Sequence, residues 1–312
     1  MTCGKRNAGG LGLLLSLIFP LLVLLGLDVL YPPEMAHGLL GVQWADLALG
    51  CLALVCIAAM LPLIRNQYRT IRGYMLILPC LFVMIALVNP DVLYFSLYHL
   101  AGLALCAASV YYLRFLTREK RLSDLFLAVF CLSAGAVAVP YLQWLVLPLL
   151  VLHGKQILYV LTGMLLPWLY HFSWNYLVSD QDPISWAGGV FSALIAVKQQ
   201  WFSMSLLQWI VLVLLVLIAA LAVLYLFRKE RALLRPVQWQ AVLAVLYAAV
   251  LTGVLVMIFE SSFLNCWQLL PLIPTSLIIF DYLHDRCSDH EGRLLVILLV
   301  GSVLVLRISQ LM

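Results

Sequence analysis

The feature that most constrains this chain is a series of long, almost uncharged apolar runs, which recur over nearly its whole length. A helix needs about 20 predominantly apolar residues to cross the hydrocarbon core of a bilayer. Several of the runs reach that length. Strands of an outer-membrane barrel alternate polar and apolar residues, and these runs do not. The runs therefore predict an all-α, polytopic transmembrane helical bundle.

The composition agrees with a membrane protein. Hydrophobic residues make up 65% of the 312 residues and charged residues 10%, whereas soluble domains are nearer half apolar and a quarter charged. Apart from residues 179–203, no long polar segment interrupts the runs. We therefore expect a single transmembrane domain over residues 1–312 and no soluble domain.

We expect about nine to eleven spans. The candidates are residues 10–31, 45–64, 73–89, 92–114, 125–139, 141–153, 157–178, 204–227, 240–259, 264–283 and 294–311. The first run lacks a small-residue cleavage site and is long for a signal peptide, so we interpret it as an uncleaved span. Runs 125–139 and 141–153 are short and flank Pro140. They are one kinked span, a re-entrant hairpin or two tilted short helices.

Basic residues predict the orientation. All of the 18 lysines and arginines except Lys198 and Arg307 fall in or beside alternate connections. Connections rich in basic residues stay in the cytoplasm. The N-terminus should therefore be cytoplasmic, and turns 116–122 and 154–156 should share one side, which favours a paired crossing by 125–153. Because orientation explains the net charge of +4, we expect no nucleic-acid partner.

Acidic residues gather at the opposite, outer boundaries of the predicted spans. The seven are Asp28, Glu34, Asp46, Asp91, Asp180, Asp182 and Glu260. One interpretation is that membrane insertion simply tolerates acids outside, because they contribute little to orientation. The other is an outward acidic vestibule that binds a cation or acts on a polar head group.

The outer segment near residues 183–201 predicts an amphipathic helix lying on the outer surface. Asp182 and Pro183 are typical of a helix start, and Trp186 and Trp201 suit the head-group zone of a membrane. Apolar residues between them recur at roughly helical spacing. The helix is either a structural cover over the bundle or a lid over a lipid-facing site.

Polar side chains in span 157–178 form the first candidate binding site. His171 and Asn175 are four residues apart and share a helix face, and Pro167 should bend the helix below them. An intramembrane histidine is a candidate functional residue. Here it is either part of an interfacial aromatic belt or part of a polar pocket shared with Asp180 and Asp182.

Two other outward polar ends extend the set of candidates. His99 lies inside span 92–114, and Glu260 precedes span 264–283. The candidate binding residues are therefore His171, Asn175, Asp180, Asp182, His99 and Glu260. Asp281 lies beside His284, Asp285 and Arg286 at the other boundary, where the sequence predicts a solvated ion-pair cluster.

Known catalytic signatures are missing from the sequence. It contains no GxSxG, no GxxxxGK, no HExxH and no repeated DxxxD. The eight cysteines are scattered without a CxxC pair, which favours buried apolar thiols over metal ligands. We expect no metal and no cofactor.

Three passages carry a family resemblance. They are residues 114–152, where a basic loop leads into a helix rich in small residues and then a short crossing; residues 154–177, with Gly163 and Pro167 in a G-x-x-x-P arrangement; and the proline-containing segment 266–283. Together they resemble uncharacterised multi-pass inner-membrane proteins of Bacteroidota, catalogued only as a domain of unknown function. The resemblance implies a Gram-negative inner membrane and supplies no activity. The charged, Trp-rich turn of that family is reduced here to residues 153–156.

Three functions remain open, and whether the chain is an enzyme stays undecided. The first is a non-catalytic or accessory component of cell-envelope or lipid-linked glycan assembly, with membrane lipids, a lipid-linked glycan or other envelope proteins as partners. The second is a glycosyltransferase that uses a polyprenyl-phosphate sugar at the outer face, with Asp28 or Glu34 as the general base. The third is a small transporter with a site framed by the proline-bent helices.

Overall fold

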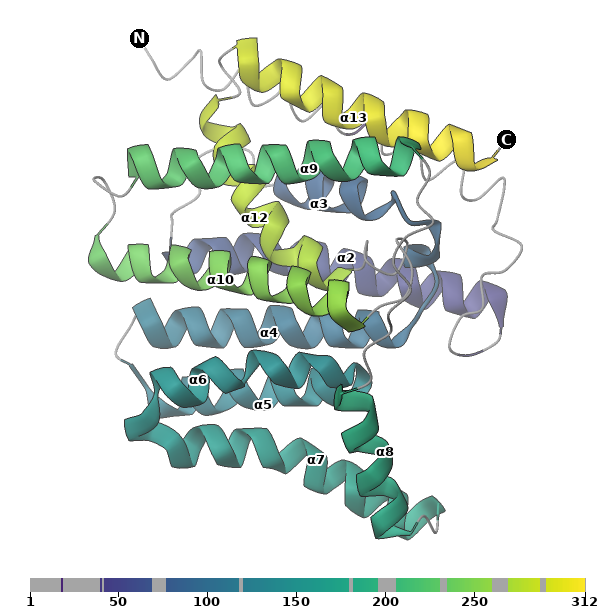
Figure 1. The fold of residues 1–312 in the computed structure, drawn as a ribbon, viewed down its shortest axis with the longest axis vertical. Coiled ribbons are helices and arrows are strands. Elements are labelled where there is room, and N and C mark those ends of the chain that lie inside the picture. Colours follow the sequence, from purple (N-terminus) through teal and green to yellow (C-terminus); the bar gives the residue numbers. More distant parts are fainter. Residues whose placement is uncertain are drawn as a thin grey trace.

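The computed structural model describes residues 18, 40, 42–68, 77–117, 120–179, 182–195, 206–230, 235–259, 269–286 and 290–311 (Figure 1). Within these ranges every regular element is a helix and there is no strand. The predicted all-α bundle is thereby confirmed. The longer helices are α2 (Gln43–Tyr68), α4 (Leu97–Thr117), α5 (Leu122–Ala138), α7 (Ile157–Ser179), α9 (Leu206–Tyr225), α10 (Pro236–Phe259), α12 (Leu269–Arg286) and α13 (His290–Leu311). The shorter elements are α3 (Ile77–Ala86), η1 (Pro90–Leu93), η2 (Pro140–Leu145), α6 (Leu147–Leu152), η3 (Gly154–Gln156), α8 (Pro183–Ile195) and the π-helical turn η4 (Leu226–Glu230).

Each expected span from 45–64 onward corresponds to helical structure, and the first, 10–31, lies outside the described residues apart from Ile18. Within the described part of the chain, four helices are long and apolar enough to cross a membrane by themselves: Trp44–Tyr68, Leu97–Thr117, Trp209–Arg228 and Pro236–Phe259. Several others are apolar but shorter. The segments Pro140–Leu152 and Gly154–Val178 meet at a bend of 102° and together would make a fifth span.

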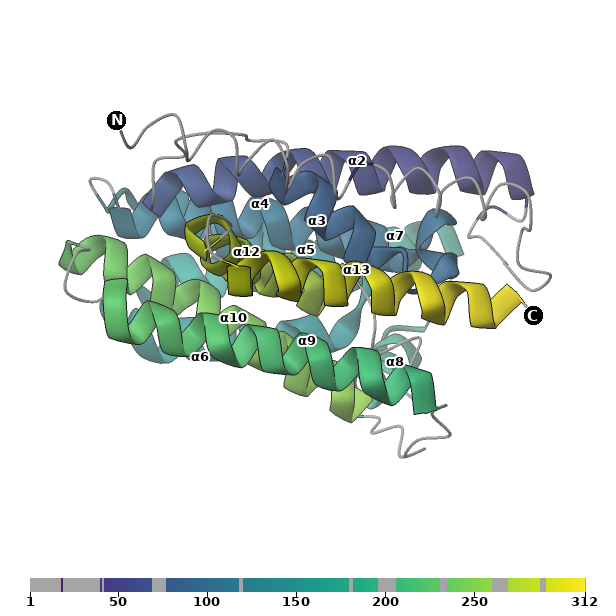
Figure 2. The same ribbon diagram turned by 90° about the horizontal axis from the view of Figure 1, so that it is seen from above.

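Most of the long helices run along one direction, and their turns fall at two ends of the bundle (Figure 1). The connections α4–α5, α6–α7, α9–α10 and α12–α13 all turn at the same end. These connections and the helix ends beside them carry 11 of the 18 lysines and arginines, so we call this the basic end and the other the opposite end. Seen from above, α2 and α4 lie on one side and α9 and α10 on the other, with α12 and α13 between them (Figure 2).

His153 ties the α6–α7 turn to the end of α4. Its Nε2 lies 3.2 Å from the Tyr112 hydroxyl, and its ring meets Phe115 edge-on at 5.1 Å between centroids. Lys120, in the α4–α5 turn, acts on the same imidazole. The two turns therefore share one end of the bundle, as the paired crossing of residues 125–153 predicted.

The same imidazole gives a pH-dependent prediction. Burial, and then the positive charge of Lys120, lower the pKa of His153 below its usual 6.5. As pH falls below about 6.5 the unfolded chain gains a proton that the folded chain resists, so stability is full above this pH and declines below it. We expect the melting temperature in detergent to fall more between pH 7.5 and 5 for the wild type than for His153→Gln. Equal slopes would contradict the prediction.

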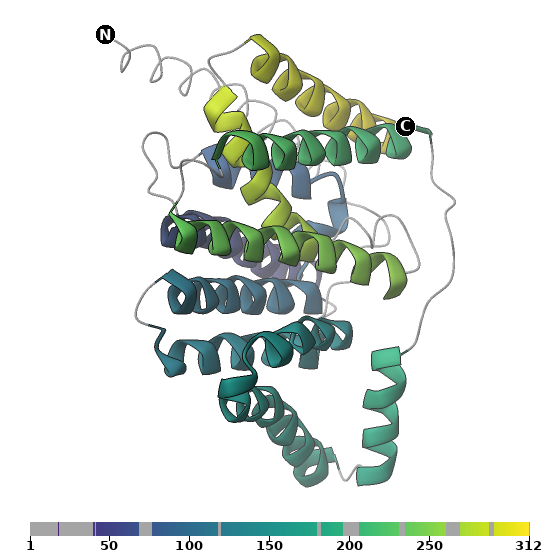
Figure 3. The same cartoon turned by 60° about the vertical axis from the view of Figure 1, so that its left-hand side comes forward.

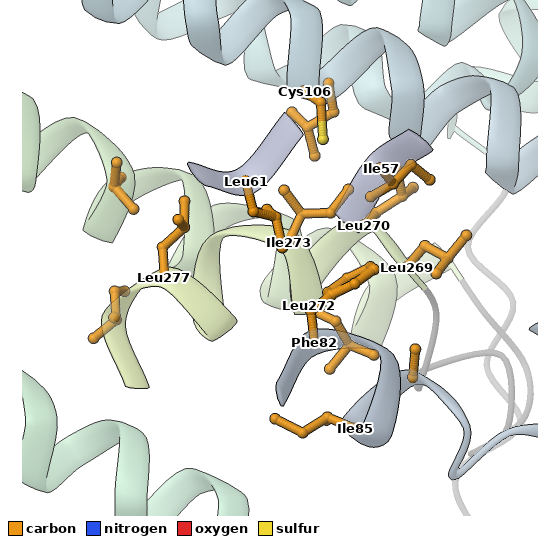
Figure 4. Close-up of a cluster of buried hydrophobic side chains, with 14 of the residues drawn as sticks. Ile57, Leu61, Phe82, Ile85, Cys106, Leu269, Leu270, Leu272, Ile273 and Leu277 are labelled. Carbon is orange, nitrogen blue, oxygen red and sulfur yellow. The ribbon is translucent and has the colours of Figure 1, made fainter. Parts of the chain in front are cut away.

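Helix α12 forms the centre of the core. It crosses the bundle obliquely (Figure 1), and its Leu269, Leu270, Leu272, Ile273 and Leu277 are buried among side chains of three other helices. Figure 4 shows them meeting Ile57 and Leu61 of α2, Phe82 and Ile85 of α3, and Cys106 of α4. Pro274 lies inside α12 and removes one of its backbone hydrogen bonds. Within it, the Thr275 hydroxyl donates to Pro271 O at 2.7 Å and the Ser276 hydroxyl to Ile273 O at 2.9 Å.

Helix α2 approaches the segment before α4 at backbone distance. The Phe95 amide donates to Asp46 O at 2.9 Å. A Cβ atom added at Gly50 would lie 2.1 Å from Leu93 O and 2.8 Å from Phe95 N. Only a residue without a side chain fits there, so Gly50 fixes how closely α2 packs on this segment.

Candidate functional site

The arrangement of α7 begins with the glycine and proline singled out in the sequence. At Gly163 an added Cβ would be 3.0 Å from Phe126 O and 3.2 Å from Phe130 N, so α7 lies directly on the backbone of α5. Pro167 follows one turn later inside the helix and removes the amide that would bond the Gly163 carbonyl. Gly163 thus marks the point where α7 packs on α5. Pro167 marks the start of the part of α7 that carries His171 and Asn175.

Beyond Pro167, side chains of α7 and α8 form an aromatic group that we call the α7–α8 cluster: Trp168, His171, Phe172, Asn175 and Trp186. The Trp186 indole lies against three of these rings, with centroid distances of 5.0 Å to Phe172, 5.9 Å to His171 and 6.5 Å to Trp168. His171 and Asn175 lie one turn apart on the same face of α7, as their spacing predicted, and are in contact. Trp174, three residues after His171 on α7, is 55% exposed.

Asp182 positions α8 by capping its first turn. Its carboxylate accepts a hydrogen bond from Ser185 N at 3.1 Å, and its carbonyl accepts from Trp186 N at 3.0 Å. Helix α8 lies across the opposite end of the bundle, steeply angled to α9 and α10 (Figure 3). Its Trp186, Val190 and Leu194 are half-buried, whereas Phe191 is exposed. This agrees with the predicted amphipathic surface helix, although residues 196–201 lie outside the described ranges.

Two residues of η2 that the sequence did not single out hold α7 and α8 in place. Gln143 accepts a hydrogen bond from Trp168 Nε1 at 3.1 Å, and Trp144 Nε1 donates to Leu194 O at 3.0 Å. Gln143 is the one side-chain amide in the otherwise apolar stretch 125–152. That isolation was the available signal, because a lone amide in an apolar run requires a partner.

The cluster contains hydrogen-bonding capacity that its own residues leave unused. Asn175 Nδ2 lies 3.2 Å from both ring nitrogens of His171 and 2.8 Å from His171 O. An atom equidistant from both nitrogens cannot lie along either lone pair, so the amide sits over the ring face. Trp186 Nε1 is buried and has no hydrogen-bond acceptor among the described residues. An indole N–H without an acceptor and an imidazole ring therefore lie side by side among aromatic residues. A few polar groups in a mainly apolar and aromatic lining are typical of a ligand site.

His99 is committed to local structure and lies apart from the cluster, on α4. The Ser96 amide donates to its Nδ1 at 3.2 Å, so the proton resides on Nε2, which donates to Val92 O at 2.8 Å. The Ser96 hydroxyl is also 3.0 Å from Nδ1. These hydrogen bonds hold the segment before α4 in place. His99 therefore belongs to that segment and not to the α7–α8 cluster.

The acidic residues at this end divide among separate elements. Asp46 is buried on α2, and its Oδ1 accepts a hydrogen bond from Leu40 N at 3.0 Å. Asp91 lies in η1, where desolvation by the surrounding protein raises the pKa of its carboxyl. The candidates Asp28, Glu34, Asp180 and Glu260 lie outside the described residues, so the acidic vestibule stays a prediction. Among described residues, no group of three or more His, Cys, Asp or Glu could hold a metal ion.

Asp281 corrects a prediction made from the sequence. It is not part of a solvated cluster: it is 3% exposed, and its Oδ1 lies 2.5 Å from Nε of Arg65, a residue on α2. The Tyr68 hydroxyl lies 3.4 Å from its other oxygen, and the Arg65 guanidinium stacks 4.7 Å from the Phe280 ring centroid. Helix α2 covers the end of α12, a long-range contact that no local pattern in the sequence signals.

No family model, curated protein or solved structure matches this chain.

Proposed function

We propose that this chain is a non-catalytic accessory component of cell-envelope assembly in a bacterial inner membrane, where its α7–α8 cluster holds a lipid-linked glycan at the outer face. The observation that carries the proposal is the buried Trp186 N–H, which lies beside the His171 ring and has no acceptor among the residues that the structure describes. A sugar hydroxyl supplies such an acceptor, and aromatic rings accommodate the apolar face of a sugar.

The surface of α7 supports an amphipathic ligand rather than a free sugar. The exposed apolar side chains of this helix continue from its start to its end; they are Ile157, Leu158, Tyr159, Leu165, Leu166, Leu169, Tyr170, Trp174, Tyr176, Leu177 and Val178. A polyprenyl chain can lie along this lipid-facing surface while its head group reaches the cluster. The contacts of the candidate residues favour binding over catalysis. The Asp182 carboxylate caps the first turn of α8, and the His99 ring is hydrogen-bonded to the backbone before α4, so neither is free to act as an acid or base.

The predicted membrane orientation and the family resemblance also support the proposal. The basic connections at one end favour the cytoplasm for that end, which places α8 and the cluster on the outer side. The resemblance to Bacteroidota inner-membrane proteins agrees with this placement and adds no activity.

The test compares two tryptophan variants in full-length protein reconstituted in nanodiscs. Trp186→Phe keeps an aromatic ring and removes the N–H, and Trp174→Phe makes the same change at an exposed site of α7. Native mass spectrometry would measure binding of a polyprenyl-diphosphate-linked sugar and of the sugar-free polyprenyl phosphate. We expect Trp186→Phe to weaken binding of the glycosylated lipid by about 3- to 10-fold, the loss of one hydrogen bond, with Trp174→Phe unchanged.

Two results would contradict the proposal. One is equal binding of the glycosylated and sugar-free lipids by the wild type. The other is equal affinity of both variants for the glycosylated lipid. The accessory role has its own test, because a pull-down without a stable envelope partner, joined to intact envelope integrity in a deletion strain, would remove its basis.

A further inference from the structure

Arg114, in the last turn of α4, has no carboxylate paired with it among the residues that the structure describes. Its Nε is buried and lacks a hydrogen-bond partner in the same part of the chain. The residue as a whole is only half-buried, so it keeps an accessible surface. A guanidinium carries five N–H donors in a fixed fork. An acceptor from outside the chain can therefore reach a cation that the described residues leave uncompensated.

Two close contacts show which way the side chains of α4 point. Helix α4 lies between α2 and α5 (Figure 1). A Cβ added at Gly102 would lie 3.0 Å from the side chain of Ile57 on α2, so Gly102 faces α2. A Cβ added at Gly135 of α5 would lie 2.9 Å from Cβ of Ala104, so Ala104 faces α5. Leu103 therefore points into the sector between α2 and α5, because successive residues of a helix are turned by about 100°.

The sector occupied by Leu103 continues along α4 to the basic end. Three more residues lie on this face, at successive spacings of four, three and four: Ala107, Val110 and Arg114. All four residues are half-buried, and Leu100, one turn before them, is 43% exposed. These four residues form the α4 strip, which is apolar, partly open to the membrane, and ends at a cation. From its first to its last residue the helix rises about 16 Å, which is close to half of the hydrocarbon core and thus the depth of one leaflet.

We propose that the α4 strip binds one anionic phospholipid of the leaflet at the basic end. Arg114 holds the phosphate, because an arginine fork matches the geometry of phosphate oxygens, and an acyl chain lies along the apolar part of the strip. With no carboxylate paired to Arg114 among the described residues, the site favours a head group of net negative charge, as in phosphatidylglycerol, over zwitterionic phosphatidylcholine. Basic sites between transmembrane helices on the cytoplasmic side bind lipid head groups in this way.

The experiment titrates full-length protein in detergent micelles with phosphatidylglycerol or phosphatidylcholine and counts bound lipids by native mass spectrometry. We expect one phosphatidylglycerol to bind saturably and more tightly than phosphatidylcholine. Arg114→Gln should weaken it about tenfold, the loss of a hydrogen bond to a charged group. Lys155→Gln is the matched control, because it removes the same charge from an exposed site at the same end; binding should change by less than about twofold.

A second variant tests the acyl chain without changing any charge. Ala107→Phe fills the α4 strip and should weaken phosphatidylglycerol several-fold, whereas Ala59→Phe, on an exposed face of α2, should not. The proposal is overturned if the two lipids bind equally well, or if Arg114→Gln binds phosphatidylglycerol as the wild type does. If Arg114→Gln does not fold, the lipid preference of the wild type and the Ala107→Phe comparison decide. Trp186→Phe should leave phosphatidylglycerol binding unchanged, because the α7–α8 cluster lies at the opposite end, so this site does not depend on the function proposed above.

Discussion

Asp281→Ala lowers the free energy of unfolding by about 3–5 kcal/mol, the loss expected when one partner of a buried ion pair is removed and the other remains charged. The charge left behind is Arg65, which at 2% exposure is out of reach of bulk solvent. Reversible unfolding in mixed micelles, monitored by circular dichroism, measures this change.

The control for this prediction removes both charges together. Arg65→Met combined with Asp281→Leu leaves no unpaired charge, so the double variant should recover to within about 1–2 kcal/mol of the wild type. A double variant as unstable as Asp281→Ala would mean that packing, rather than charge, dominates at this position.

Gly50→Ala has a comparable effect by a different mechanism. The new methyl group would lie 2.1 Å from Leu93 O, an atom of the backbone that cannot rotate away. Helix α2 must then shift off the segment before α4, which breaks the bond from Phe95 N to Asp46 O. We expect a loss of about 3 kcal/mol or more, at the upper end for an overpacked site.

Two other glycines serve as matched controls for Gly50. An added Cβ at Gly253 or Gly301 would meet nothing within 4 Å, and both lie inside helices. Alanine there should be neutral or stabilise by up to about 1 kcal/mol through helix propensity. If Gly50→Ala melts at the temperature of these controls, the close approach of α2 to Leu93 is not present in the protein.

The positions of the helices could be predicted from the sequence, because the thickness of the bilayer sets how many apolar residues a spanning helix needs. The run 204–227 became α9 with η4, and 240–259 fell within α10. Predictions were less accurate at prolines. The expected span 92–114 starts later, at Leu97, because Pro90 opens the short turn η1 instead. Of the expected span 73–89, residues 73–76 lie outside the described ranges, and Ile77–Ala86 form α3.

The candidate site was predictable where its residues are close in sequence. His171 and Asn175 share a face because they are one turn apart, and Asp182 caps a helix because of its position before Pro183. Gln143 and Trp144 complete the site from η2, and Arg65 pairs with Asp281 across 216 positions. Such contacts follow from how helices pack, which the spacing of residues along one helix does not encode.

Because 216 positions separate Arg65 from Asp281, the two residues are synthesised at different times. At a synthesis rate of 5–20 residues per second, roughly 10–40 s pass between the translation of Arg65 and that of its counter-ion. During this interval α2 has been synthesised, and its Arg65 has no counter-ion from α12. We expect the side chain to snorkel to the aqueous boundary until Asp281 is in place. Because α12 also supplies the centre of the core, its contacts with α2, α3 and α4 form only after α12 has been made, whereas α2, α4, α5 and α7 can pack on one another before it.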